Sequence, residues 1–72
     1  MTAGMLAPLT RPELDALLAD AEHADAKAHI ALANADLRQP GRVYAAAGVA
    51  ADCLGLWMDA LDESIRRWMV AP

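Results

Sequence analysis

The sequence contains no phenylalanine, only one cysteine and one serine, and its aromatic content is 4% of 72 residues. Because Cys53 has no second cysteine to pair with, an internal disulfide is excluded, and no Cys or His spacing suggests a structural zinc site. Any hydrophobic core therefore has to be built from leucine, methionine, alanine and two tryptophans. A reducing compartment fits this cysteine usage best.

Basic residues and long apolar runs are also scarce. Six Lys and Arg against ten Asp and Glu give a formal net charge of -4, which repels a phosphate backbone and disfavours nucleic-acid binding. No run approaches the roughly 20 apolar residues of a transmembrane helix, and residues 1–9 lack the basic region of a secretory signal. We therefore expect a cytoplasmic protein that binds neither nucleic acid nor membrane.

Alanine is present in excess, at 18 of 72 residues, and favours helix. Thr10 and Glu13 have the spacing of a capping box, and Pro12 lies in what would be the first helical turn. Nothing interrupts the pattern until Pro40, which disfavours helix at the residue before it. The sequence therefore predicts a first helix over residues 10–38.

The remaining chain predicts a turn at residues 39–41 and a second helix over 42–69. Two helices of similar length joined by a short turn pack antiparallel. The expected fold class is all-α, with a single helical-hairpin domain over 1–72 that includes an N-terminal arm at 1–9. The alanine and arginine content is also typical of bacterial or phage genomes rich in GC, although this association has no physical weight.

Each predicted helix has an apolar stripe when its residues are projected at 100° per residue. In the first helix the stripe is Leu14, Leu17, Leu18, Ala21, Ala28, Leu32 and Ala35. In the second it is broad, and its larger members are Leu54, Trp57, Met58, Leu61, Ile65 and Trp68. The opposite side of the second helix carries Asp52, Asp59, Glu63 and Arg66, which we expect to be solvated.

This amount of apolar surface exceeds what a two-helix hairpin can bury. A chain below about 70 to 80 residues rarely gains more than about 3 to 5 kcal/mol from its own core, and this one has neither a disulfide nor an evident metal site. The sequence therefore predicts a homodimeric four-helix bundle, with the six larger residues of the second stripe at the interface. A complex with a different protein satisfies the same physical requirement.

Asp25 lies in the middle of the first apolar stripe, and His29 follows it by one helical turn. An unpaired buried carboxylate is costly, so the two side chains are expected to pair with each other. Three interpretations compete: a polar pair that sets register and oligomeric state, a pair that is simply exposed, and a metal or catalytic site. Metal binding is disfavoured, because the Glu-x-x-His motif of di-iron bundles is absent.

No arrangement of catalytic residues stands out. Ser64 is the only serine, Cys53 lies near an apolar stripe where thiols are usually inert, and there is no glycine-rich phosphate loop. We expect no enzymatic activity and no cofactor. The favoured function is an acidic interaction module that associates with itself and binds another protein as an adaptor, inhibitor or assembly factor; the alternative is a metal-binding bundle that uses Asp25 and His29.

Overall fold

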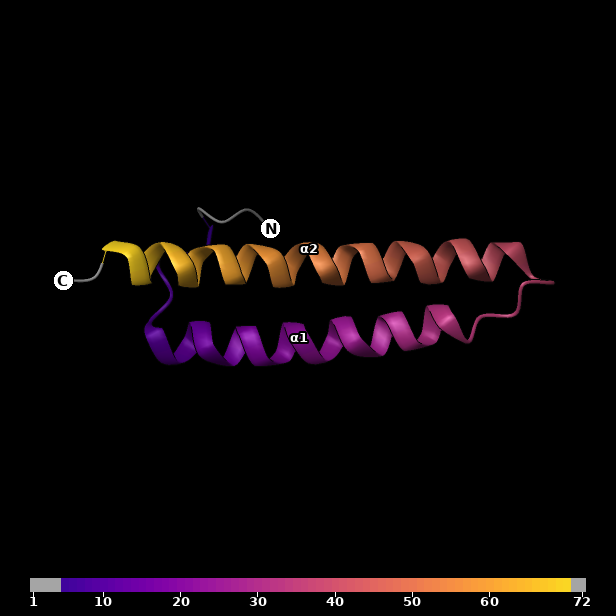
Figure 1. Cartoon of the computed structure of the whole chain (residues 1–72), viewed down its shortest axis with the longest axis horizontal. Coiled ribbons are helices and arrows are strands. Elements are labelled where there is room, and N and C mark those ends of the chain that lie inside the picture. The colour runs from indigo at the N-terminus through magenta and orange to yellow at the C-terminus, as the bar shows by residue number, and fades with distance from the viewer. Residues whose placement is uncertain (1–4, 71–72) are drawn as a thin grey trace.

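The computed structural model describes residues 5–70 and consists of two helices packed antiparallel (Figure 1). Helix α1 spans Arg11–Ala33 and helix α2 spans Pro40–Val70. The molecule is a thin rod of 54 × 17 × 16 Å. No strand occurs in residues 5–70, so the predicted all-α helical hairpin is confirmed. Residues 1–4 of the predicted N-terminal arm lie outside the described residues.

The start of α1 agrees with the sequence signals. The Thr10 backbone N–H donates to Glu13 Oε1 at 2.8 Å, and the Glu13 backbone N–H donates to Thr10 Oγ1 at 3.3 Å. These two bonds form the predicted capping box, with Pro12 in the first turn. Leu9 packs against the cluster that contains Leu14 and so fixes the direction in which the chain enters the helix.

The predicted end of the first helix is wrong by five residues, since α1 ends at Ala33 rather than at 38. The chain turns earlier because Asp36 Oδ1 accepts a hydrogen bond from the Arg38 backbone N–H at 2.9 Å, and the Asp36 carbonyl accepts one from the Gln39 N–H. Side chains of this kind compete with the helical backbone for hydrogen bonds. Residues 34–39 therefore form the connection, instead of 39–41.

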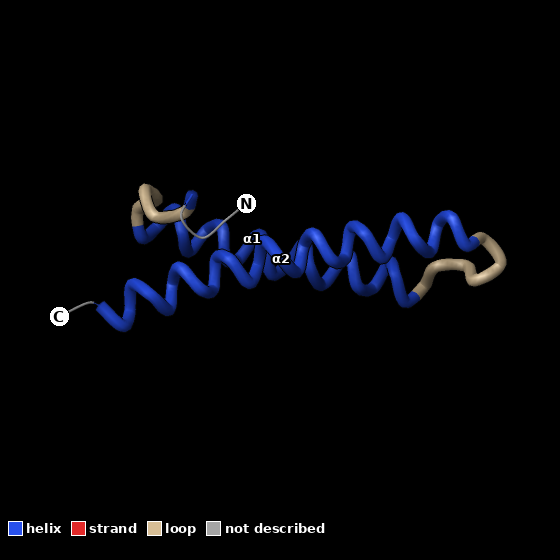
Figure 2. The backbone as a smooth tube through the Cα atoms, turned by 90° about the horizontal axis from the view of Figure 1, so that it is seen from above, coloured by secondary structure: helices blue, strands red, loops and turns tan. Residues whose placement is uncertain are grey.

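Pro40 begins α2 rather than ending α1. Proline suits the first position of a helix, because the N–H that it lacks would have no helical acceptor there. Val43 N–H donates to the Gln39 carbonyl, which closes the first turn of α2. As a result α2 is longer than predicted, and Figure 2 shows its last turns running beyond the start of α1.

Two features fix the register of the hairpin. Arg11 Nη1 donates to Ser64 Oγ at 3.2 Å, and Leu14 shares a buried cluster with Ala60. When two residues lie on facing turns of α1 and α2, their sequence positions therefore add up to 74 or 75. By this rule Asp25, in the middle of α1, lies at the level of Ala50.

The hydrophobic core is small. Its buried apolar residues are Leu6, Leu14, Ala21, Ala28, Ala50 and Ala60, of which four are alanines. Leu6 comes from the arm that crosses α2 near the C-terminal end of that helix (Figure 1), and packs with Leu14 and Ala60. Many larger apolar side chains stay outside this core. In residues 5–70 no helix is both long enough and apolar enough to cross a bilayer.

Candidate interaction surface

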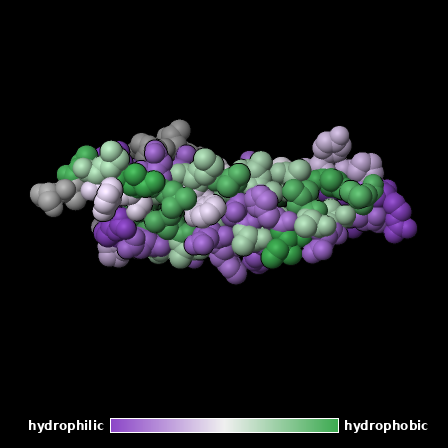
Figure 3. Space-filling model, viewed as in Figure 1, coloured by the Kyte–Doolittle hydropathy of each residue, from purple (hydrophilic) through white to green (hydrophobic). Residues whose placement is uncertain are grey.

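One face of α2 carries a row of apolar side chains that are partly or largely exposed. We call this row the outer stripe, and its residues are Leu54, Met58, Leu61, Ile65 and Trp68, which are between 36% and 80% exposed. Apolar residues appear in Figure 3 as a broken band along the visible face of the hairpin. Exposed apolar surface of this kind is typical of protein interaction sites.

The broad apolar stripe predicted for the second helix divides into two rows in the structure. The inner row, which includes Ala50, Trp57 and Ala60, is buried or partly buried in the hairpin. Each residue of the outer stripe directly follows a residue of this inner side, so the stripe is rotated by about 100° from the direction of α1. Of the six residues predicted at the interface, Trp57 is therefore largely occupied within the hairpin, and the other five are exposed.

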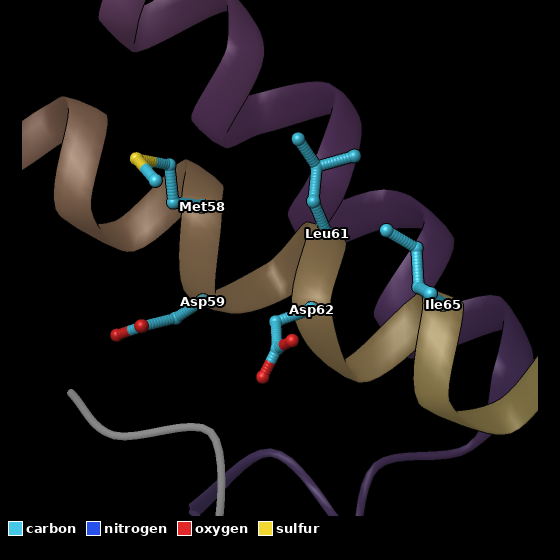
Figure 4. A pocket seen from close by; sticks show the side chains of 5 residues that line it. All are labelled: Met58, Asp59, Leu61, Asp62 and Ile65. Atoms are coloured by element: carbon cyan, nitrogen blue, oxygen red, sulfur yellow. The ribbon is translucent and has the colours of Figure 1, made fainter.

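The outer stripe borders an open groove of about 390 Å³ lined by Met58, Asp59, Leu61, Asp62 and Ile65. In Figure 4 the side chains of Met58, Leu61 and Ile65 lie on one side of the helix, and the carboxylates of Asp59 and Asp62 point away from them. The groove thus has an apolar wall and an acidic rim. This is the composition of a protein interface, in which an apolar centre is surrounded by polar residues.

The expectation that Glu63 is solvated is wrong, because its side chain is 1% exposed. Arg66 Nε donates to Glu63 Oε2 and Arg67 Nε donates to Glu63 Oε1, each at 2.9 Å. Glu63 is thus paired with both arginines, which follow it by three and four residues. Hydrogen bonds from Arg66 and Arg67, in that order, lower the pKa of Glu63 from 4.5 to about 2.

Arg67 also holds the N-terminal arm in place. Its Nη2 donates to the carbonyl oxygens of Leu6, Ala7 and Leu9 at 3.1, 3.2 and 2.6 Å. These bonds satisfy backbone acceptors of an irregular segment and hold the Leu6 side chain in the core. The roles of Leu6 and Arg67 were not predicted from the sequence, because contacts between residues about 60 positions apart leave no periodic signal.

The arm borders a second groove, of about 500 Å³, along the first half of α1. Its lining residues are Met5, Leu6, Leu9, Glu13, Ala16, Leu17 and Asp20. Leu6 and Leu9 already pack against the core from this side. The arm of the same chain therefore partly fills this groove, whereas the outer stripe has no covering segment among residues 5–70.

Asp25 and His29 lie one helical turn apart on α1, with their polar atoms close together. His29 Nδ1 lies 2.9 Å from the Asp25 carbonyl oxygen and 3.1 Å from Asp25 Oδ1. The Asp25 side chain is 14% exposed and that of His29 is 47% exposed. With the proton on Nδ1 the hydrogen bond goes to the carbonyl, so the buried Oδ1 accepts no hydrogen bond from any described residue. This one oxygen is therefore desolvated without a hydrogen bond to compensate for it.

The described residues offer little for chemistry. In residues 5–70 no three His, Cys, Asp or Glu side chains gather closely enough to hold a metal ion. Asp25 and His29 supply two such groups. Cys53 is a free, partly buried thiol, and the Ser64 hydroxyl accepts the hydrogen bond from Arg11.

The remaining acidic residues lie on the surface. Asp15, Asp20, Asp52 and Asp62 are exposed, and Asp59 is partly exposed. Glu63 is therefore not part of the acidic, solvated side of the second helix that the sequence predicts.

Comparison with protein-family models, curated proteins and solved structures finds no match for this chain.

Proposed function

We propose that this protein is a small non-enzymatic interaction module that associates with itself through the outer stripe of α2 and presents an acidic surface to another protein. The observation that supports the proposal most strongly is the exposure of Leu54, Met58, Leu61, Ile65 and Trp68 on a hairpin with a core of mostly alanines. Leaving these side chains in water forfeits about 1.5 to 3 kcal/mol for each large residue that a partner would bury fully.

The size of the outer stripe suits a second copy of the chain. With about 200 Å² for each fully exposed large side chain, its exposed fractions amount to roughly 500 Å² per chain, or about 1,000 Å² for two copies. A specific protein interface needs about 1,000 Å² in total. A homodimeric four-helix bundle reaches this size with the stripe alone when all of this area is covered, and flanking residues supply the remainder when it is covered in part.

The acidic residues of the surface provide the second half of the proposed function. A net charge of -4 and exposed carboxylates such as Asp20 and Asp52 would steer the dimer toward a basic surface on a target protein, and salt would weaken this steering. The role is that of an adaptor, inhibitor or assembly factor in the cytoplasm, where Cys53 stays reduced.

Two matched variants test the proposed interface. Ile65 lies in the outer stripe and Val49 lies outside it on the same helix, yet both are β-branched and their exposures are 53% and 56%. We expect Ile65→Asp to convert the dimer to a monomer in size-exclusion chromatography with light scattering. Val49→Asp, which changes the charge and the helix propensity in the same way, should leave the dimer intact.

The helix content of both variants, measured by circular dichroism at the same concentration, separates dissociation from unfolding. A wild-type protein that is a folded monomer would overturn the proposal. Equal weakening by both aspartates would show that the added charge, rather than the outer stripe, controls association.

A further inference from the structure

We infer that two copies pair through α2 in an antiparallel arrangement, with the two-fold axis passing between Asp59 and Ala60. The inference rests on the proposed self-association and adds the geometry of the contact. The observations behind it are the spacing of the outer stripe, the sizes of its residues and the direction of α1 relative to the stripe.

The outer stripe, extended by the exposed Ala51, has the same spacing in both directions. Its positions are 51, 54, 58, 61, 65 and 68, so the intervals are 3, 4, 3, 4 and 3 whether they are counted from the first or from the last residue. Alternating intervals of three and four are those of residues that pack knobs into holes against a partner helix. Among reversed copies, only one centred between residues 59 and 60 places every position of one helix at the level of a position of the other. A parallel copy in register does so as well, and the sizes of the side chains decide between the two.

In this register the side chains at the same level complement each other in size. Met58 lies level with the partner's Leu61, Leu54 with the partner's Ile65, and Ala51 with the partner's Trp68. A parallel pair would instead place indole against indole and alanine against alanine. Since Trp68 is 80% exposed, the small residue opposite it provides the room that the ring needs.

The position of α1 also favours a perpendicular two-fold axis. The outer stripe lies about 100° around α2 from the side that faces α1. A two-fold axis perpendicular to the helices keeps both α1 helices on the same side of the paired α2 helices, whereas an axis parallel to the helices would put them on opposite sides. Antiparallel pairing therefore closes a four-helix bundle at the centre of the dimer.

The antiparallel arrangement also accounts for a glycine at position 55. A Cβ at this position would meet no atom within 4 Å in the single hairpin, so the hairpin itself does not require glycine. In the antiparallel pair Gly55 lies on the flank of the seam, beside the partner's Asp62. The missing side chain leaves space for this carboxylate to reach water.

Spin-label distances test the pairing in the full chain. Ala45, Asp52 and Asp59 are spaced by seven residues and so share one outer face of α2. Each is replaced by cysteine in a Cys53→Ala background, labelled with a nitroxide, and the distance within the dimer is measured by pulsed electron resonance. At 1.5 Å per residue, the two labels should be separated along the bundle by about 2 Å at position 59, about 22 Å at 52 and about 44 Å at 45.

Light scattering on each labelled sample measures self-association independently of the antiparallel geometry that the distances test. A dimeric mass with distances that rise from 59 to 52 to 45 supports the antiparallel pair. A dimeric mass with three equal distances, or with the shortest distance at 45 or 52, overturns the pairing and leaves self-association standing. A monomeric mass for the wild type removes both.

Discussion

Replacement of Trp68 by alanine should weaken self-association strongly without unfolding the hairpin. The indole is 80% exposed in the single chain, which corresponds to about 200 Å² of a tryptophan surface of about 250 Å². If a partner helix covers half of this area, burial contributes about 2.5 kcal/mol per indole at 25 cal/mol per Å². A symmetric dimer contains two such indoles, so the loss is about 5 kcal/mol at most.

Since 1.4 kcal/mol corresponds to a tenfold change, the dissociation constant should rise by about three orders of magnitude. Sedimentation equilibrium over a dilution series of wild type and Trp68→Ala measures this change. Leu37→Ala is the matched control, because Leu37 is an exposed apolar residue of the connection between the helices. A dissociation constant for Trp68→Ala within twofold of wild type would refute the assignment of Trp68 to the interface.

Three further predictions concern the hairpin itself. Glu63→Gln should lower the melting temperature at pH 7. Since the folded-state pKa of Glu63 is depressed from 4.5 to about 2, the extra stability of the wild type should be lost as the pH falls between these values. Parallel pH profiles of the melting temperature for the two proteins would contradict the buried ion pair. Leu6→Ala should lower the free energy of unfolding, measured with a chemical denaturant, by about 2 to 4 kcal/mol because Leu6 is buried. Met5→Ala, at an exposed neighbour, should lower it by less than about 0.5 kcal/mol. Equal effects would place the arm outside the core. Asp25→Leu should raise stability by about 1 to 3 kcal/mol, since it removes a buried oxygen that accepts no hydrogen bond from the described residues; a loss of stability would show that the carboxylate is compensated.

The helices were predictable where local chemistry decides the structure. The start of α1 follows from Thr10, Pro12 and Glu13, because a capping box involves residues only three apart. Its end was not predictable with the same rules, since Pro40 is compatible both with stopping one helix and with starting the next. In the structure α1 ends at Ala33, the Arg38 backbone N–H donates to Asp36 in the connection, and Pro40 begins α2.

The candidate surface was predictable only in part, for reasons of geometry. Periodicity locates the apolar residues of α2 but does not divide them into an inner row and an outer stripe until the direction of α1 is known. The burial of Glu63 depends on the arm, whose contacts to Arg67 span about 60 residues of sequence. Long-range contacts of this kind leave no periodic signal, although an acidic residue followed by arginines at three and four positions was a visible hint.

The most direct test of the central claim is the mass of the wild-type protein in solution. Sedimentation equilibrium at micromolar concentration should give twice the chain mass of 7.6 kDa, with the tryptophan emission shifting to shorter wavelength as the concentration rises. A folded, helical species of 7.6 kDa whose emission does not change with concentration would contradict the claim that the outer stripe is an interface.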